Sequence, residues 1–137
     1  MQLDQLTNNL PALFAAAFTA TLFIQSGLDK VFDWSGNLEW LTGHFSKTFI
    51  AGMVPMMLGT ITILELATGF LAAAGVIYFL ATGSLTLIFY SGVLGAASIT
   101  ALFFGQRLAK DYAGAAVLVP YFVLMLIVML LARPPLT

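Results

Sequence analysis

The stretch Val54–Leu80, VPMMLGTITILELATGFLAAAGVIYFL, decides the fold of this chain. About 20 apolar residues suffice for a helix to cross a bilayer, and this stretch exceeds that length. Its one charged residue is Glu65, and no other charge occurs from Thr48 to Gln106. A carboxylate near the middle of the hydrocarbon costs roughly 2.5–3.5 kcal/mol on insertion scales. Glu65 is therefore tolerated only if it is protonated, paired or in contact with water, and it is the first candidate functional residue.

The composition of the whole chain agrees with a surface that faces lipid. Hydrophobic residues make up 61% and charged residues only 8%, with a mean hydropathy of +1.00. Soluble domains carry about 25% charged residues, because their surface must face water. The net charge of −1 gives no reason to expect a nucleic-acid partner. We expect a multi-pass protein of the cell's inner (cytoplasmic) membrane, with membrane lipids as its surroundings.

The hydropathy pattern predicts an all-α fold, an integral membrane four-helix bundle with a short interfacial helix between spans one and two. The expected spans are 10–32, 54–80, 85–104 and 113–132, within a single domain 1–137. The expected interfacial helix, about 35–47, is too short and too polar to span. Its apolar residues recur on one helical face: Trp34, Leu38, Leu41 and Phe45. In span one, a ridge of alanines at four-residue spacing favours close helix contact: Ala12, Ala16 and Ala20.

The residues available for redox or metal chemistry are few. The chain has no cysteine and one histidine, His44. Disulfide exchange, thiolate catalysis, iron–sulfur ligation and a bis-histidine haem are therefore excluded within this chain. We expect no metal site and no cofactor held by this chain alone, and a non-catalytic role is favoured over an enzyme. His44 is more readily explained as an interfacial polar residue than as a ligand.

The depth of Glu65 identifies the residues expected around it. With a rise of about 1.5 Å per residue, Glu65 lies about 16 Å from Val54, near the midplane. Lys30, near the edge of span one, falls just short of a direct ion pair, unless a water or a helix offset closes the gap. The polar residues expected at a matching depth are Gln25, Thr21, Ser98, Ser91 and Tyr121.

A polar pocket centred on Glu65 is the functional interpretation of these residues. It would open toward the basic end of the bundle and bind a quinone-like or lipid headgroup; that end carries Lys30, Arg107, Lys110 and Asp111. The structural alternative is that Glu65 is protonated and hydrogen-bonded across the bundle. Likewise, the charges of the loop expected at 105–112 are explained without a site if lipid headgroups solvate them.

The distribution of basic residues predicts the orientation in the membrane. An even number of spans places both termini on one side, and the first and third connections on the other. The connection side carries Lys30, Lys47, Arg107 and Lys110, whereas the terminal side carries Arg133. The positive-inside rule therefore places the connections in the cytoplasm and the termini outside.

Three short motifs resemble those of the DoxX family of small membrane proteins. They are Phe23-Ile24-Gln25-Ser26-Gly27-Leu28-Asp29-Lys30, Glu65-Leu66-Ala67-Thr68-Gly69, and the segment 107–116, RLAKDYAGAA. The resemblance covers nearly the whole chain. It implies a four-helix membrane bundle, some relatives of which are small hydrophobic subunits linked to quinone-dependent oxidoreductases.

Three functions remain open at this point. The leading hypothesis is a non-catalytic membrane subunit or binding module of a quinone-linked redox complex, with protein partners that carry the electrons. The second is a proton-coupled carrier of a small solute that uses Glu65 as its titrating group, although no inverted repeat is found. The third is an enzyme that modifies a lipid or isoprenoid, for which the sequence offers no nucleophile or metal site.

Overall fold

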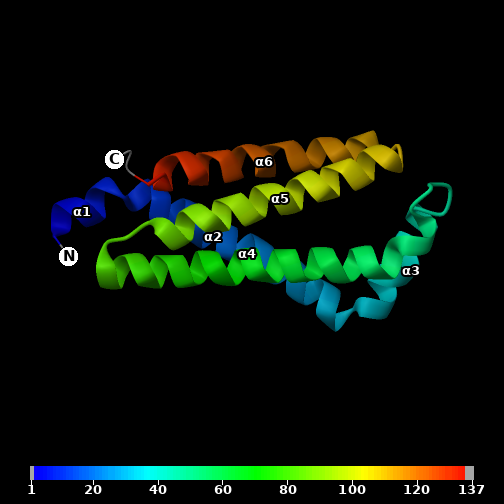
Figure 1. The fold of residues 1–137 in the computed structure, drawn as a ribbon, viewed down its shortest axis with the longest axis horizontal. Helices are drawn as coiled ribbons and strands as arrows, with labels where there is room; N and C mark the ends of the chain where they lie inside the picture. The colour runs from blue at the N-terminus through cyan, green and yellow to red at the C-terminus, as the bar shows by residue number, and fades with distance from the viewer. Residues whose placement is uncertain (1, 135–137) are drawn as a thin grey trace.

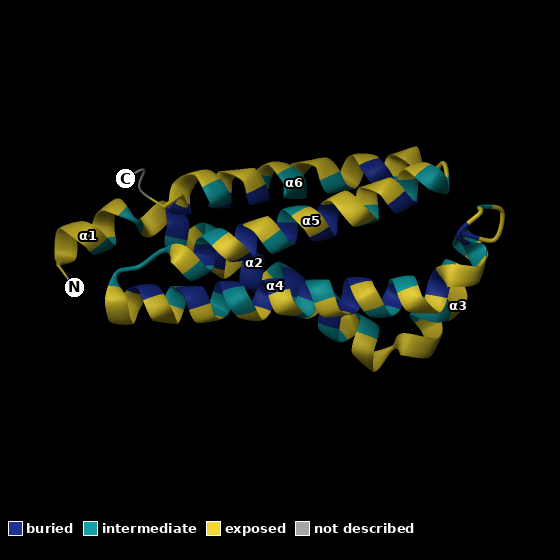
Figure 2. Ribbon diagram, viewed as in Figure 1, coloured by how far each residue is buried: buried dark blue, intermediate teal, exposed yellow. Residues whose placement is uncertain are grey.

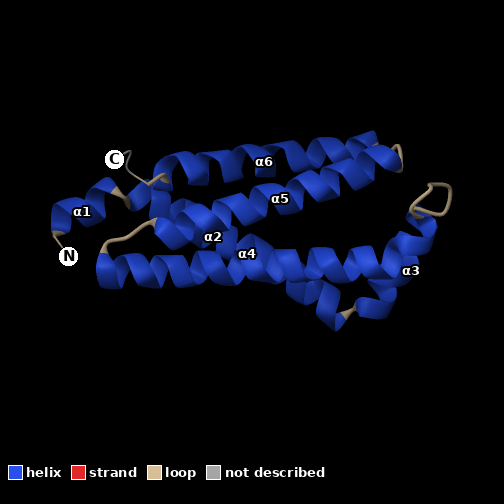
Figure 3. Ribbon diagram, in the orientation of Figure 1, coloured by secondary structure: helices blue, strands red, loops and turns tan. Residues whose placement is uncertain are grey.

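The computed structural model describes residues 2–134, and the regular elements of this part of the chain are all helices, joined by short loops and without a strand (Figure 3). The short helices are α1 (Leu3–Asn8), α3 (Trp34–His44) and a 3-10 turn, Ala51–Met53. The long helices are α2 (Leu10–Phe32), α4 (Val54–Thr82), α5 (Thr86–Leu108) and α6 (Tyr112–Ala132). These four long helices are long and apolar enough to cross a membrane, which indicates a multi-pass membrane protein.

Two helix ends differ from the sequence prediction by three residues or more, and α1 was not predicted. The third long helix does not end at 104, because α5 continues through Gly105 to Leu108. Arg107 suits the last turn of a helix, where the unpaired carbonyl groups favour a cation, so its charge does not indicate a loop. The interfacial helix ends at His44 rather than at 47, and the chain then turns toward α4.

The long helices are arranged as antiparallel neighbours (Figure 1). The extensive contacts are between α2 and α4, between α4 and α5, and between α5 and α6, while α2 and α6 touch less. α1 and the α4–α5 turn lie at one end of the bundle, and α3 and the α5–α6 turn lie at the other (Figure 1). The turn at 83–85 is tight, and Gly83 adopts a φ of 79° there, a backbone conformation that favours glycine.

Small residues bring the helices close together. The alanine ridge of α2 is buried, as the sequence predicts, at Ala12, Ala16 and Ala20. A Cβ added at Gly69 of α4 would lie 2.7 Å from the backbone nitrogen of Ile24 in α2. Buried positions recur along α4, α5 and α6, while much of their outward surface is exposed and apolar (Figure 2). Packing at this distance requires glycine or alanine, which is the usual way that helices associate in lipid.

Helix α3 packs against the beginning of α4. Phe45, directly after α3, is buried with Ile50 and Val54, and Leu38 and Leu41 pack against these three residues. The apolar face predicted for this segment therefore points largely to the bundle. Trp40 is 60% exposed, and we expect it to lie among lipid headgroups.

Candidate functional site

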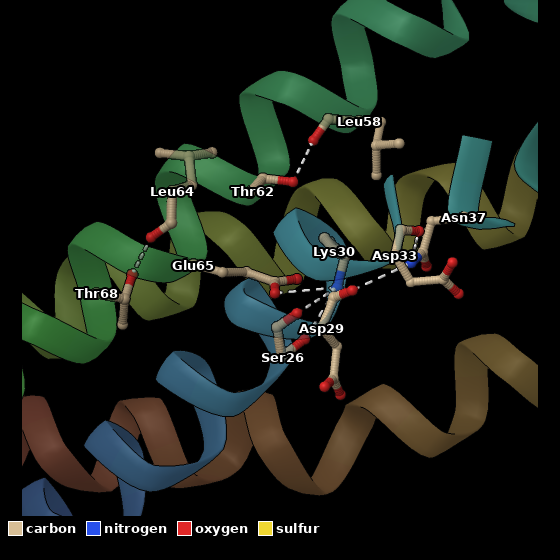
Figure 4. A network of polar contacts seen from close by, with 10 residues as sticks. All are labelled: Ser26, Asp29, Lys30, Asp33, Asn37, Leu58, Thr62, Leu64, Glu65 and Thr68. Carbon is tan, nitrogen blue, oxygen red and sulfur yellow. Dashed lines mark hydrogen bonds and ion pairs between the residues drawn. The ribbon is translucent and has the colours of Figure 1, made fainter. Parts of the chain in front are cut away.

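Glu65 lies inside the bundle, as the sequence predicts, and its partner is Lys30. Glu65 as a whole residue is 1% exposed, and Oε2 of its carboxylate accepts a hydrogen bond of 3.0 Å from the Lys30 ammonium (Figure 4). Lys30 also donates to the hydroxyl of Ser26 at 2.9 Å and to the Ser26 carbonyl oxygen at 3.3 Å. All three N–H groups of the ammonium therefore have an acceptor. The pair joins the end of α2 to the middle of α4.

An offset between the two helices places Lys30 within reach of Glu65. Cβ atoms built at Gly27 and at Gly69 would meet Leu66 and Ile24 respectively, so α2 and α4 run antiparallel with these positions side by side. In this register Lys30 lies roughly level with residue 63, about 3 Å along the axis from Glu65. The first two turns of α4 extend about 10 Å beyond the end of α2. The expectation that a direct ion pair falls just short is therefore wrong, and the helix offset is the physical reason.

The other polar residues expected beside Glu65 do not bond to it. Ser98 and Ser91 are buried, but their hydroxyls donate to carbonyl oxygens of their own helix, at 2.9 and 2.7 Å. Gln25 and Thr21 lie on the outer face of α2 and are exposed, and Tyr121 packs half-buried in the hydrophobic core. These residues were predicted only from their estimated depth in the membrane. The direction in which a side chain points also depends on the rotation of its helix about the helix axis, and that rotation turns these side chains away from Glu65.

A second polar cluster, formed by His44, Gln106 and Asp111, joins α3 to the α5–α6 turn. The Nε2 atom of His44 lies 2.7 Å from Oε1 of Gln106 and 3.8 Å from Oδ2 of Asp111. The His44 ring stacks on Trp40 with centroids 4.5 Å apart. Asp111 also caps α6, because it accepts a hydrogen bond of 2.9 Å from the backbone N–H of Gly114. His44 is thus an anchor of α3, and the sequence prediction overlooked Gln106.

The remaining basic residues expected at the site lie at this same end of the bundle. The guanidinium carbon of Arg107 lies 4.6 Å from the centre of the Tyr112 ring, a cation–π contact. Lys110 is exposed and has a φ of 59° in the tight turn between α5 and α6. Of the four charged residues predicted at this end, only Lys30 bonds to Glu65 in the described structure; the other three are Arg107, Lys110 and Asp111.

An apolar cavity lies between the first half of α4, the last half of α5 and the end of α3; we call it the α4–α5 cavity. Its volume is about 460 Å³, within the range of pockets that hold small organic ligands. The side chains that shape it include Trp40, Phe45, Met53, Met56, Met57, Leu64, Ala101, Phe104 and Gln106. Neither Glu65 nor Lys30 lines this cavity. At Glu65 the structure thus places an ion pair with Lys30, and the cavity beside it is apolar.

The cavity was not predicted, although one signal in the sequence pointed to it. Met53, Met56 and Met57 gather at the start of α4, and methionine is common where a surface must adapt to irregular apolar partners. Their arrangement around a cavity depends on how α4, α5 and α3 meet, which hydropathy does not report.

Comparison of the chain with protein-family models, with curated proteins and with solved structures finds no match in any of the three. The resemblance to the DoxX family stays a prediction that rests on the three motifs.

Proposed function

We propose that this chain is a multi-pass protein of the cytoplasmic membrane and a non-catalytic binding module for an apolar ligand with a polar head, such as a quinone or a lipid. The observation that carries the proposal is the α4–α5 cavity, at about 460 Å³. Its wall is almost wholly apolar, while Gln106 lines it at the end where the His44–Gln106–Asp111 cluster lies. Such a site suits a ligand that enters from the bilayer and keeps its polar head near the interface.

The protein partners in this proposal are the redox subunits of a quinone-linked membrane complex. The chain has no cysteine and a single histidine, so electron carriers of the iron–sulfur or bis-histidine haem type belong to another subunit. The resemblance to the DoxX family supports the same role. In this arrangement the chain holds the ligand in the membrane, and its partner carries out the electron transfer.

The Lys30–Glu65 pair has a structural role in this proposal. Lys30 already bonds to Oε2 of Glu65 and to Ser26, so a headgroup that took Oε2 would have to break an existing charge-assisted hydrogen bond. Leu64, the neighbour of Glu65 in α4, lines the cavity, so the pair supports the cavity wall without facing the ligand. The carrier hypothesis gains no support here, since α4 is continuous through Glu65 and carriers commonly break their helices at the binding site.

Fluorescence of Trp40 tests ligand binding directly, because Trp40 lines the cavity and Trp34 does not. The Trp34→Phe protein, reconstituted in lipid nanodiscs, is titrated with decylubiquinone, a quinone that quenches tryptophan on contact. We expect quenching that saturates. Ala101→Phe should raise the apparent Kd at least about tenfold, since loss of well-packed contact area costs 1.4 kcal/mol or more.

Ala97→Phe is the matched control. Ala97 lies one turn before Ala101 on α5 and is likewise exposed, but it does not line the cavity. It should bind decylubiquinone like the parent protein. Quenching that rises linearly with quinone, to the same extent in all three proteins, would reflect partition into the lipid and would contradict the proposed site. Lipid retained by the parent and lost in Ala101→Phe, measured by mass spectrometry, would identify a lipid as the ligand instead.

A further inference from the structure

The outer face of α2 carries an exposed seam with the spacing of a coiled coil. The α2 seam consists of residues separated alternately by four and three positions: Phe14, Phe18, Thr21, Gln25, Leu28 and Phe32. All of them are exposed except Leu28, which is half-buried. An alternation of four and three is the pattern that lets two helices pack along a continuous left-handed seam. The buried residues of α2, among them Ala16 and Phe23, lie on its opposite face, inside the bundle.

Gln25 gives this seam its specificity. It lies seven residues before the end of α2 at Phe32, and therefore about 10 Å inside it. Among the described residues, its amide has no hydrogen-bond partner, whereas Thr21 on the same face donates to the carbonyl oxygen of Ala17 at 3.0 Å. Lipid chains offer an amide neither a donor nor an acceptor, so a glutamine at this depth requires a partner outside this chain.

We propose that the α2 seam binds a second copy of this chain. A primary amide carries both donors and an acceptor, so two Gln25 side chains related by a two-fold axis can bond to each other reciprocally. A polar residue at one inner position of a helix pair also sets the register of the two helices. The amide therefore favours an identical, parallel α2 helix, with the two-fold axis along the membrane normal.

The shape of the seam agrees with this occupant. A hollow of about 390 Å³ lies on this face, lined by Phe14, Ala17, Phe18, Thr21, Leu22 and Gln25. The small side chain of Ala17 leaves space between the two exposed phenylalanines, and a phenylalanine from an identical seam fits such a hollow. Asp29 is exposed directly after Leu28 and therefore lies on the flank of the seam, so the carboxylates of the two copies do not lie between the paired helices. This inference depends on membrane insertion and not on the ligand of the α4–α5 cavity.

Disulfide crosslinking in native membranes tests the seam, and the absence of cysteine from the chain makes single-cysteine variants clean. Thr21→Cys, treated with copper phenanthroline, should form a dimer of twice the mass. Thr100→Cys is the matched control: Thr100 is also exposed, and it also donates to a carbonyl oxygen four residues earlier, at 2.7 Å. It lies on α5 and should remain monomeric.

Gln25→Leu, added to Thr21→Cys, should weaken the crosslink, and dimer dissociation in detergent should become roughly 3- to 20-fold easier, as expected for lost interhelical hydrogen bonds. Membrane fractionation of each variant shows that it is still inserted. Equal crosslinking at Thr21→Cys and Thr100→Cys would overturn the proposal, because it would indicate random collision. A crosslink from Thr21→Cys to a protein of different mass would overturn it as well, since the seam would then serve another partner.

Discussion

At the residue scale, the Lys30 ammonium saturates all its donors on only two residues, Ser26 and Glu65. The Lys30 side chain is 17% exposed and that of Glu65 is 2% exposed, so the pair is largely out of contact with solvent. A buried charge that loses its partner is strongly destabilising, although replacing both partners by apolar residues is often neutral. The pair therefore makes the packing of α2 on α4 specific without necessarily making it stronger.

This asymmetry can be measured. Lys30→Met leaves the Glu65 carboxylate without its partner and should lower the free energy of unfolding by roughly 3–5 kcal/mol. Glu65→Gln, which keeps an acceptor for Lys30, should cost less. The Lys30→Met/Glu65→Leu double variant should recover most of the loss. Unfolding in mixed detergent micelles, followed by circular dichroism, provides the measurement. A double variant as unstable as Lys30→Met would show that the pair contributes net stability, contrary to this expectation.

At the scale of the helices, the register of α2 against α4 determines which residues meet. Two glycines set it, because side chains of α2 and α4 occupy the space that a Cβ would need. Leu66 occupies the space beside Gly27, and Ile24 occupies the space beside Gly69. The same register carries Lys30 to within about half a turn of Glu65. A change at either glycine should therefore disturb the ion pair as well as the local packing.

Gly69→Ala tests this register. Its Cβ would lie 2.7 Å from the backbone nitrogen of Ile24, and backbone cannot move aside as a flexible side chain does. We expect a loss of roughly 1–3 kcal/mol, typical of overpacking. Gly59→Ala is the matched control in the same helix, since its Cβ would meet only Trp34, at 3.7 Å. It should be neutral or slightly stabilising in the same unfolding assay. Equal losses for the two variants would argue against a register set by close packing.

At the scale of the whole molecule, the bundle divides into a tightly packed half and a hollow one. The end with α1 and the α4–α5 turn is closed by small residues, such as Gly75 against Ile88. The opposite end holds α3, the His44–Gln106–Asp111 cluster and the α4–α5 cavity. The proposed ligand site at one end and the exposed α2 seam at the side would suit a protein that works within a larger assembly.

Purification from native membranes tests the assembly. A tagged chain, solubilised in a mild detergent, should bring down a complex that contains flavin or haem, visible in its absorption spectrum. The Ala101→Phe variant should retain the complex while losing quinone-dependent turnover, because Ala101 lines the cavity and the added ring occupies the space that the quinone needs. A lone protein that instead transports a solute in liposomes, or that alone converts a lipid, would replace the proposed function with one of its rivals.

The fold could be predicted from the sequence to a greater extent than the candidate site. The positions of the long helices followed from hydropathy, because the cost of placing polar groups in lipid acts on every residue of a span independently of its neighbours. The α2 bounds, 10–32, are those predicted. The extension of α5 to Leu108 was not predicted, because Arg107 is compatible both with a loop and with the last turn of a helix.

The site depended on tertiary structure. The sequence by itself determined that Glu65 needs a partner or water, because that follows from one charge in an apolar span. Only the packing decided that the partner is Lys30, and that Gln25 faces outward while Ser98 bonds to its own helix. The physical reason is that a contact between helices depends on their offset and rotation, which many small packing terms set together. The hydropathy of single residues gives neither the offset nor the rotation of a helix. The α4–α5 cavity could not be predicted from the sequence for the same reason.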